Sequence, residues 1–106
     1  MTHELKGFIT ITADEIPWRE GTELTLPKGV MVKILARSKD GNRVDLEAKF
    51  PPGYTEPRHV HESSHSGVIL DGKMIIDGKT LTRGEYFYAE PNVEHGPFYY
   101  PEIKDA

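Results

Sequence analysis

Alternation of apolar and polar positions is the most regular pattern in this chain. Between residues 44 and 50 every second position is apolar and the intervening positions are charged, which predicts a strand with one face on a core. Residues 7–12 and 30–36 are rich in β-branched residues and predict two further strands. A shorter strand is expected over residues 24–26.

Short apolar runs separated by glycine turns fill the second half of the chain. The strands expected there cover residues 58–61, 67–70, 73–76, 79–81, 85–89 and 95–100. No segment places apolar residues at helical spacing over more than about two turns. Short strands with frequent turns predict an all-β sandwich or small barrel.

Composition limits the number of domains and the possible partners. A chain of 106 residues supports one hydrophobic core, so we expect a single domain over residues 1–106. The net charge of −4 lacks the clustered positive charge that nucleic acid requires. No apolar run is long enough for a signal peptide or a membrane span, so we expect a cytoplasmic protein without a membrane partner.

The histidines carry the clearest candidate chemistry. The chain has no cysteine, so a metal ion would have to be held by His, Asp or Glu. Three of the five histidines, His59, His61 and His65, lie within seven residues, and His95 follows later. On an extended strand His59 and His61 project from the same face, with Cα atoms about 6.5–7 Å apart. Their imidazoles can therefore meet on one ion at about 2.1 Å.

The spacing around these histidines resembles the first motif of the cupins, small β-barrels of the jelly-roll class. Gly53 is followed after five residues by His59 and His61, and His65 and Gly72 complete the motif over residues 53–72. Every spacing fits. One residue type departs from the pattern, because His65 stands where cupins usually have Glu.

A second cupin motif matches residues 84–99 by spacing. It begins at Gly84 and contains His95, while Glu90, Asn92 and Tyr99 replace its usual Pro, Gly and Asn. Asn is the residue after glycine that best tolerates a left-handed turn, so the change at Asn92 is mild. The two motifs together imply a cupin-type jelly-roll β-barrel.

A competing pattern lies inside the first motif. Residues 61–65 read His-Glu-x-x-His, the signature of zinc metalloproteases, which requires both histidines on one helical face. Pro57 precedes the segment, Gly67 follows it within two residues, and two of its five residues are serines, so barely one helical turn could form. We therefore expect Glu62 to be a solvated loop residue.

The cupin resemblance implies a mononuclear site for one divalent transition metal ion, with Fe, Mn, Ni, Cu or Zn as candidates. The expected ligands are His59, His61, His65 and His95. His65 is either a fourth ligand, which we favour, or a residue that supports the ligands.

Alternation along the last expected strand assigns its aromatic residues to two faces. It places Tyr99 on the same face as His95, where Tyr99 lines the site or packs in the core, while Phe98 and Tyr100 point away.

Cupin sites with three or four histidines resemble those of oxygen-activating enzymes. The resemblance implies a dioxygenase that acts on a small enolisable or phenolic molecule, and a homodimer as the assembly. Two alternatives remain open: a non-catalytic metal-bearing or sensory cupin, and a metal-assisted isomerase or decarboxylase. The second is disfavoured because the sequence shows no charged cluster suited to a phosphate or carboxylate.

Overall fold

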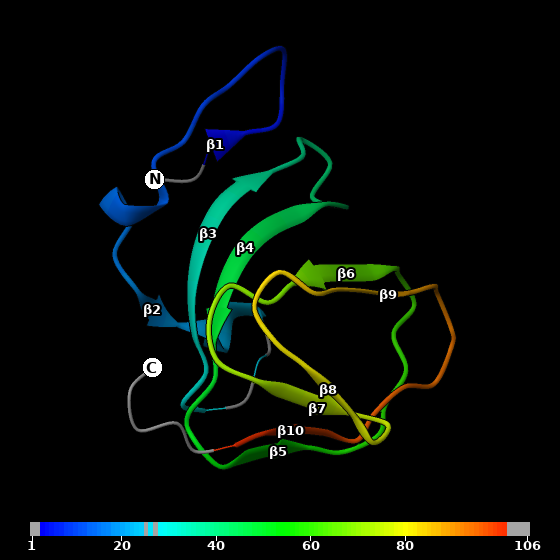
Figure 1. Ribbon diagram of the computed structural model, residues 1–106. Helices are drawn as coiled ribbons and strands as arrows, with labels where there is room; N and C mark the ends of the chain where they lie inside the picture. Colours follow the sequence, from blue (N-terminus) through cyan, green and yellow to red (C-terminus); the bar gives the residue numbers. More distant parts are fainter. Residues whose placement is uncertain (1–2, 25, 27, 102–106) are drawn as a thin grey trace. The chain divides into compact units, whose positions relative to one another are not determined.

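The structure is a computed structural model that describes residues 3–24, 26 and 28–101. Strands dominate these residues, and the helical elements among them are two short 3₁₀ turns, η1 (Ala13–Glu15) and η2 (Gly21–Leu24) (Figure 1). The all-β prediction is confirmed. Within the described ranges, no helix is long and apolar enough to cross a membrane. The chain divides into two compact units, one up to Phe50 and one from Pro51 onward.

The first unit contains one four-stranded sheet organised around its longest strand. Its strands are β1 (His3–Glu4), β2 (Arg19–Glu20), β3 (Met31–Arg37) and β4 (Val44–Lys49). Strand β3 pairs in parallel with β1 and antiparallel with β2 and β4. The strands predicted over residues 30–36 and 44–50 therefore correspond to β3 and β4.

Strand β3 supplies the core of this unit. Its buried apolar side chains include Val32, Ile34 and Ala36, all at most 4% exposed. Lys33 is buried as well, and its ammonium group donates to the Ala13 carbonyl at 3.1 Å and lies 4.8 Å from the centre of the Trp18 ring. A buried lysine is tolerated when its charge keeps such partners.

The strand predicted over residues 7–12 is wrong. The segment is a loop, and Phe8 is 91% exposed. Among the described residues no strand pairs with it, and an apolar alternation without a hydrogen-bonded neighbour does not make a strand. The prediction for residues 24–26 falls partly outside the described residues, and Leu24 ends a 3₁₀ turn.

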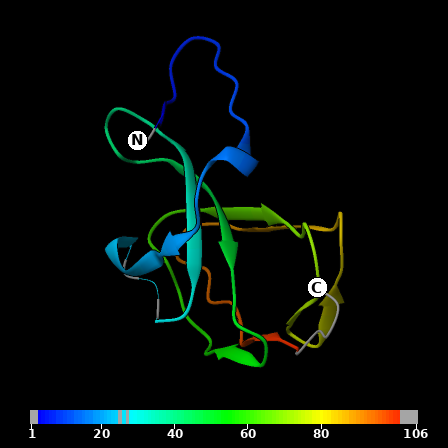
Figure 2. The ribbon, with the colours of Figure 1, turned by 90° about the vertical axis from the view of Figure 1, so that its left-hand side faces the viewer.

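The second unit contains a four-stranded sheet and a two-stranded one. The four-stranded sheet has the order β5 (Tyr54–Glu56), β10 (Phe98–Tyr100), β7 (Met74–Ile76), β8 (Lys79–Leu81), and the two-stranded sheet pairs β6 (His65–Val68) with β9 (Tyr86–Ala89). All pairings are antiparallel. Both views of the ribbon place the β6–β9 pair on the opposite side of this unit from the four-stranded sheet (Figures 1 and 2).

The register between β5 and β10 sorts their side chains onto two faces. Phe98 lies opposite Glu56, and Tyr100 lies opposite Tyr54. Phe98 and Tyr100 are buried, whereas Tyr99, between them, is 41% exposed. Side chains alternate along a strand, so Tyr54, Glu56, Phe98 and Tyr100 share one face, which we call the Phe98 face.

Candidate metal centre

One pair of backbone hydrogen bonds joins the two motifs directly at their histidines. His59 and His95 form an isolated antiparallel bridge, in which each N–H donates to the other's carbonyl at 2.9 Å. The strand predicted over residues 58–61 is thus reduced to one bridge, and the one predicted over residues 95–100 is shortened to β10. The bridge nevertheless places the two histidines side by side.

His59, His61 and His95 form a compact group. One ring nitrogen from each residue lies within 4.8 Å of those of the other two. The ring centres are 4.7 Å apart for His59 and His61, and 4.5 Å apart for His59 and His95. Nitrogens that share one ion at about 2.1 Å lie about 3 Å apart, so modest side-chain rotations close the group. The cluster is therefore capable of binding a metal ion.

Backbone carbonyls orient two of the three rings. The Nδ1 atom of His59 lies 2.8 Å from the Pro57 carbonyl oxygen, and Nδ1 of His95 lies 2.9 Å from that of Val93. Because a carbonyl oxygen only accepts, each Nδ1 carries the proton and donates, which leaves the Nε2 lone pair for an ion. The same arrangement is typical of metal-ligating histidines, so these residues fit the implied metal.

His65 lies outside the group of three. It begins strand β6, and its ring stacks on that of His61 with centres 3.9 Å apart and planes inclined by 30°. The structure thus brings three of the four predicted ligands together and places the fourth against one of them. Ligation by His65 stays a prediction.

The environment favours the neutral form of two of these imidazoles. Burial lowers the pKa of His61, and the nearby His59 and His95 lower it further. Burial also lowers the pKa of His65, with His61 as the next cause. His65 as a whole residue is exposed, but His61 covers one face of its ring. Only a neutral imidazole binds a metal ion. The lowered pKa values therefore keep His61 and His65 able to bind one at lower pH.

Phe98 takes the place beside the histidines that alternation assigned to Tyr99. The Phe98 ring lies 5.4 Å from that of His59 and 5.6 Å from that of His95, so the prediction that Phe98 points away is wrong. Alternation counted from His95 fails because Gly96 has a φ of +109°, which is not an extended conformation. Tyr99 lies on the other face of β10.

The motif spacing did not predict an ion-pair network that lies beside the site. The Arg58 guanidinium donates through Nε to the Glu94 carboxylate and through Nη1 to the Gly96 carbonyl at 2.6 Å and to Asp77 at 3.3 Å. Arg58 and Glu94 each immediately precede a histidine of the cluster. This opposite-charge pairing across the two motifs was the available signal. Arg58 therefore ties the two histidine-bearing segments together.

Asn92 behaves as its place in the second motif predicts. Its φ of +63° lies in the left-handed region, and its backbone N–H donates to the carbonyl of His61 at 2.7 Å. The turn thereby fixes the backbone next to one ligand. The segment 61–65 contains no helix, and Glu62 is exposed, so the geometry required by the metalloprotease signature is absent from it.

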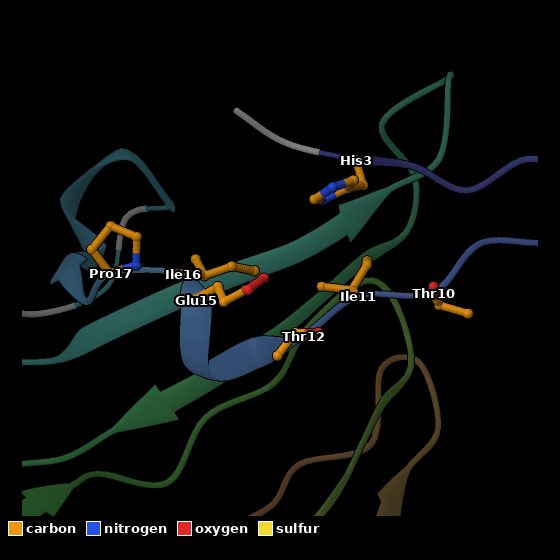
Figure 3. Close-up of a pocket in the computed structure, with 7 residues that line it drawn as sticks. All are labelled: His3, Thr10, Ile11, Thr12, Glu15, Ile16 and Pro17. Atoms are coloured by element: carbon orange, nitrogen blue, oxygen red, sulfur yellow. The ribbon is translucent and has the colours of Figure 1, made fainter.

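The first unit holds a separate cavity of about 350 Å³. Figure 3 shows its lining side chains, which come from β1 and from the segment that includes η1: His3, Thr10, Ile11, Thr12, Glu15, Ile16 and Pro17. His3 is exposed and belongs to this cavity rather than to the histidine cluster.

Comparison with known proteins agrees with the two-motif resemblance. A sequence model of the family described as the ChrR cupin-like domain matches residues 6–104. The chain belongs to this cupin family. The match extends across both units, and it confirms that the chain is a cupin.

A solved structure supports the same fold for this cupin. An RmlC-like cupin from Shewanella frigidimarina NCIMB 400 is similar, with a TM-score of 0.67 and 21% sequence identity over 86% of this chain and 78% of that chain. At this identity the similarity shows the fold. No curated protein matches this cupin.

Proposed function

We propose that this cupin is a metal-dependent oxygenase, namely a dioxygenase that acts on a small enolisable or phenolic molecule. The observation that carries the proposal is the convergence of His59, His61 and His95. Among the described residues, the candidate ligand group contains imidazoles and no carboxylate. A neutral ligand set leaves a divalent ion its full positive charge, which favours binding of an anionic substrate oxygen.

The donor set also limits the metal. Imidazole suits Fe, Mn, Ni, Cu and Zn, whereas Mg²⁺ and Ca²⁺ prefer oxygen ligands. When bound, such an ion supplies Lewis acidity and open positions for substrate and O₂. Imidazole binds Fe, and an oxygenase needs a redox-active ion, so we propose Fe²⁺ as the active form.

The residues around the cluster favour an uncharged substrate. Phe98 presents an apolar ring to His59 and His95, which suits a small aromatic or alkyl group. Arg58, the cation of the ion-pair network beside the cluster, is already paired with Glu94 and Asp77. A phosphate or carboxylate substrate would need a cation of its own, and this argues against the isomerase and decarboxylase alternatives.

Oxygen consumption tests the proposal. The Fe²⁺-loaded protein is expected to consume O₂ with at least one member of a panel of β-diketones and catechols, and to show saturation with substrate. The matched control is the Zn²⁺-loaded protein, which binds the same molecules without redox chemistry. Tight ligand binding without O₂ consumption would instead support the non-catalytic ligand-binding cupin. The homodimer and the cytoplasmic location stay predictions.

A further inference from the structure

Glu56 is a carboxylate on the Phe98 face of the four-stranded sheet. It ends β5 directly opposite Phe98 on β10. Side chains of directly opposed residues in an antiparallel pair project from the same face, with Cβ atoms about 4.5–5.5 Å apart. Because the Phe98 ring lies against His59 and His95, the register brings Glu56 to the edge of the histidine cluster.

The charge of Glu56 acts on the groups of this face. Burial raises the pKa of Tyr100, and the charge of Glu56 is the next cause. The same two causes, in the same order, raise the pKa of Tyr54. At His61, Glu56 opposes the larger effects of burial and the neighbouring imidazoles. Glu56 is itself only half-buried, so it keeps contact with solvent.

Other carboxylates next to the cluster are placed differently. Glu94 is bound by Arg58. Glu62 lies on the exposed loop between two histidines, where solvent screens its charge. Of these three carboxylates, Glu56 is the one that combines a place on the Phe98 face with partial burial.

We propose that Glu56 accepts the proton that the substrate loses when it binds as an anion. This inference rests on the proposed function and deepens it. A neutral enol-forming ketone or phenol loses a proton from carbon or oxygen, its bonding electron pair stays on the substrate, and the proton moves to a carboxylate oxygen of Glu56. The substrate class is then uncharged molecules with an acidic C–H or O–H, since the carboxylate repels substrates that arrive as carboxylates.

Deprotonation can be measured without turnover. The Zn²⁺-loaded protein is mixed anaerobically with 2,4-pentanedione in a stopped-flow instrument, and the absorbance of the enolate is followed above the spontaneous background. Glu56→Gln keeps the shape of the side chain but does not accept the proton. We expect it to form the enolate about 10² to 10⁴ times more slowly, the usual contribution of a general base.

Matched measurements separate this role from others. Glu62→Gln makes the same chemical change on the exposed loop and is expected to keep the wild-type rate. Calorimetric titration with Zn²⁺ is expected to give the same affinity for Glu56→Gln as for the wild type. A large loss of Zn²⁺ affinity would make Glu56 a metal ligand and overturn the proposal.

The remaining outcomes distinguish a failure of the role of Glu56 from a failure of the proposed function. Enolate formation at the wild-type rate in Glu56→Gln overturns the role of Glu56 and leaves the proposed function intact. A wild-type protein that binds neither the diketone nor a catechol overturns the proposed function, and the inference with it. If Glu56→Gln does not fold, Glu56→Asp retracts the carboxylate by one methylene; a slower rate at unchanged Zn²⁺ affinity supports the proposal, and an unchanged rate overturns it.

Discussion

The rings of two candidate ligands, His59 and His95, are oriented by their own local backbone. Nδ1 of His59 and Nδ1 of His95 each donate to the carbonyl two residues earlier in the chain. Such local bonds set the tautomer before an ion arrives and spare the site part of the cost of ordering its ligands. Replacement of a single histidine of the cluster is therefore expected to lower the metal affinity.

Substitution of the stacked pair tests which histidines are ligands. His61→Ala removes one of three converging donors, and we expect its Zn²⁺ affinity to fall more than 100-fold. His65→Ala removes only the ring stacked on His61, and loss of a supporting partner typically costs about 10-fold to 100-fold. Calorimetric titration measures both, and far-UV circular dichroism checks that the β-fold remains.

His3→Ala is the matched control, because His3 lies outside the cluster in the first unit. It is expected to bind Zn²⁺ like the wild type. If His65→Ala loses as much affinity as His61→Ala, the site has four ligands, as the sequence predicts.

Residue spacing predicted the clustering of the histidines better than it predicted which aromatic ring lies beside them. The two motifs identify His59, His61 and His95 because their spacing is set by a fold that joins them. Which aromatic ring faces them depends on Gly96, whose positive φ interrupts the strand. A glycine in the sequence permits that conformation without requiring it. The position of Phe98, rather than Tyr99, beside the histidines was therefore not predictable.

At the scale of elements, the site depends on a very short pairing. The bridge between His59 and His95 is one residue pair long, and a single bridge gives little rigidity of its own. Arg58 adds side-chain bonds to Glu94 and Gly96 on the opposite segment. A planar guanidinium with several donors suits such a connection.

Loss of the Arg58 side-chain bonds is expected to weaken metal binding without removing a candidate ligand. Arg58→Ala should lower Zn²⁺ affinity about 10-fold to 100-fold, as other supporting substitutions do. Arg58→Lys should recover only part of the loss, because one ammonium group cannot reproduce the fork of donors. Competition with a chelating dye measures the affinities.

The matched control is Arg43→Ala, which breaks the exposed pair of Arg43 and Asp45 in the first unit. It is expected to leave Zn²⁺ affinity unchanged. Wild-type affinity in Arg58→Ala would show that the backbone hydrogen bonds between the two segments are sufficient to hold them.

Long strands could be predicted from the sequence, whereas short strands depend on a pairing partner that the sequence does not reveal. Strands β3 and β4 have six or seven residues, long enough for a periodic pattern to appear. Strand β5 has three residues between Gly53 and Pro57, too few for any period, and it exists because β10 pairs with it. The wrong strand over residues 7–12 is the converse case, since no strand in the described part of the chain pairs with it.

At the scale of the whole molecule, we expect metal binding and folding to be linked through the histidines. Burial and neighbouring imidazoles lower the pKa of His61 and His65 in the folded protein, whereas in the unfolded chain a histidine titrates near 6.5. The unfolded chain therefore binds more protons as the pH falls below about 6.5. The stability of the metal-free protein should decrease from there toward the lower pKa values of the folded state.

Bound metal makes a second contribution to the stability of the folded protein, and this contribution also decreases as the pH falls. An ion at 100 times its dissociation constant stabilises the fold by about 2.7 kcal/mol, and protons compete for the same nitrogens. We expect Zn²⁺ to raise the melting temperature at pH 8, and the difference from the chelator-treated protein to shrink as the pH falls to 5. In His61→Ala the difference should be small at every pH. A Zn²⁺ effect that stays constant from pH 8 to pH 5 would exclude imidazole ligation, because carboxylates titrate well below that range.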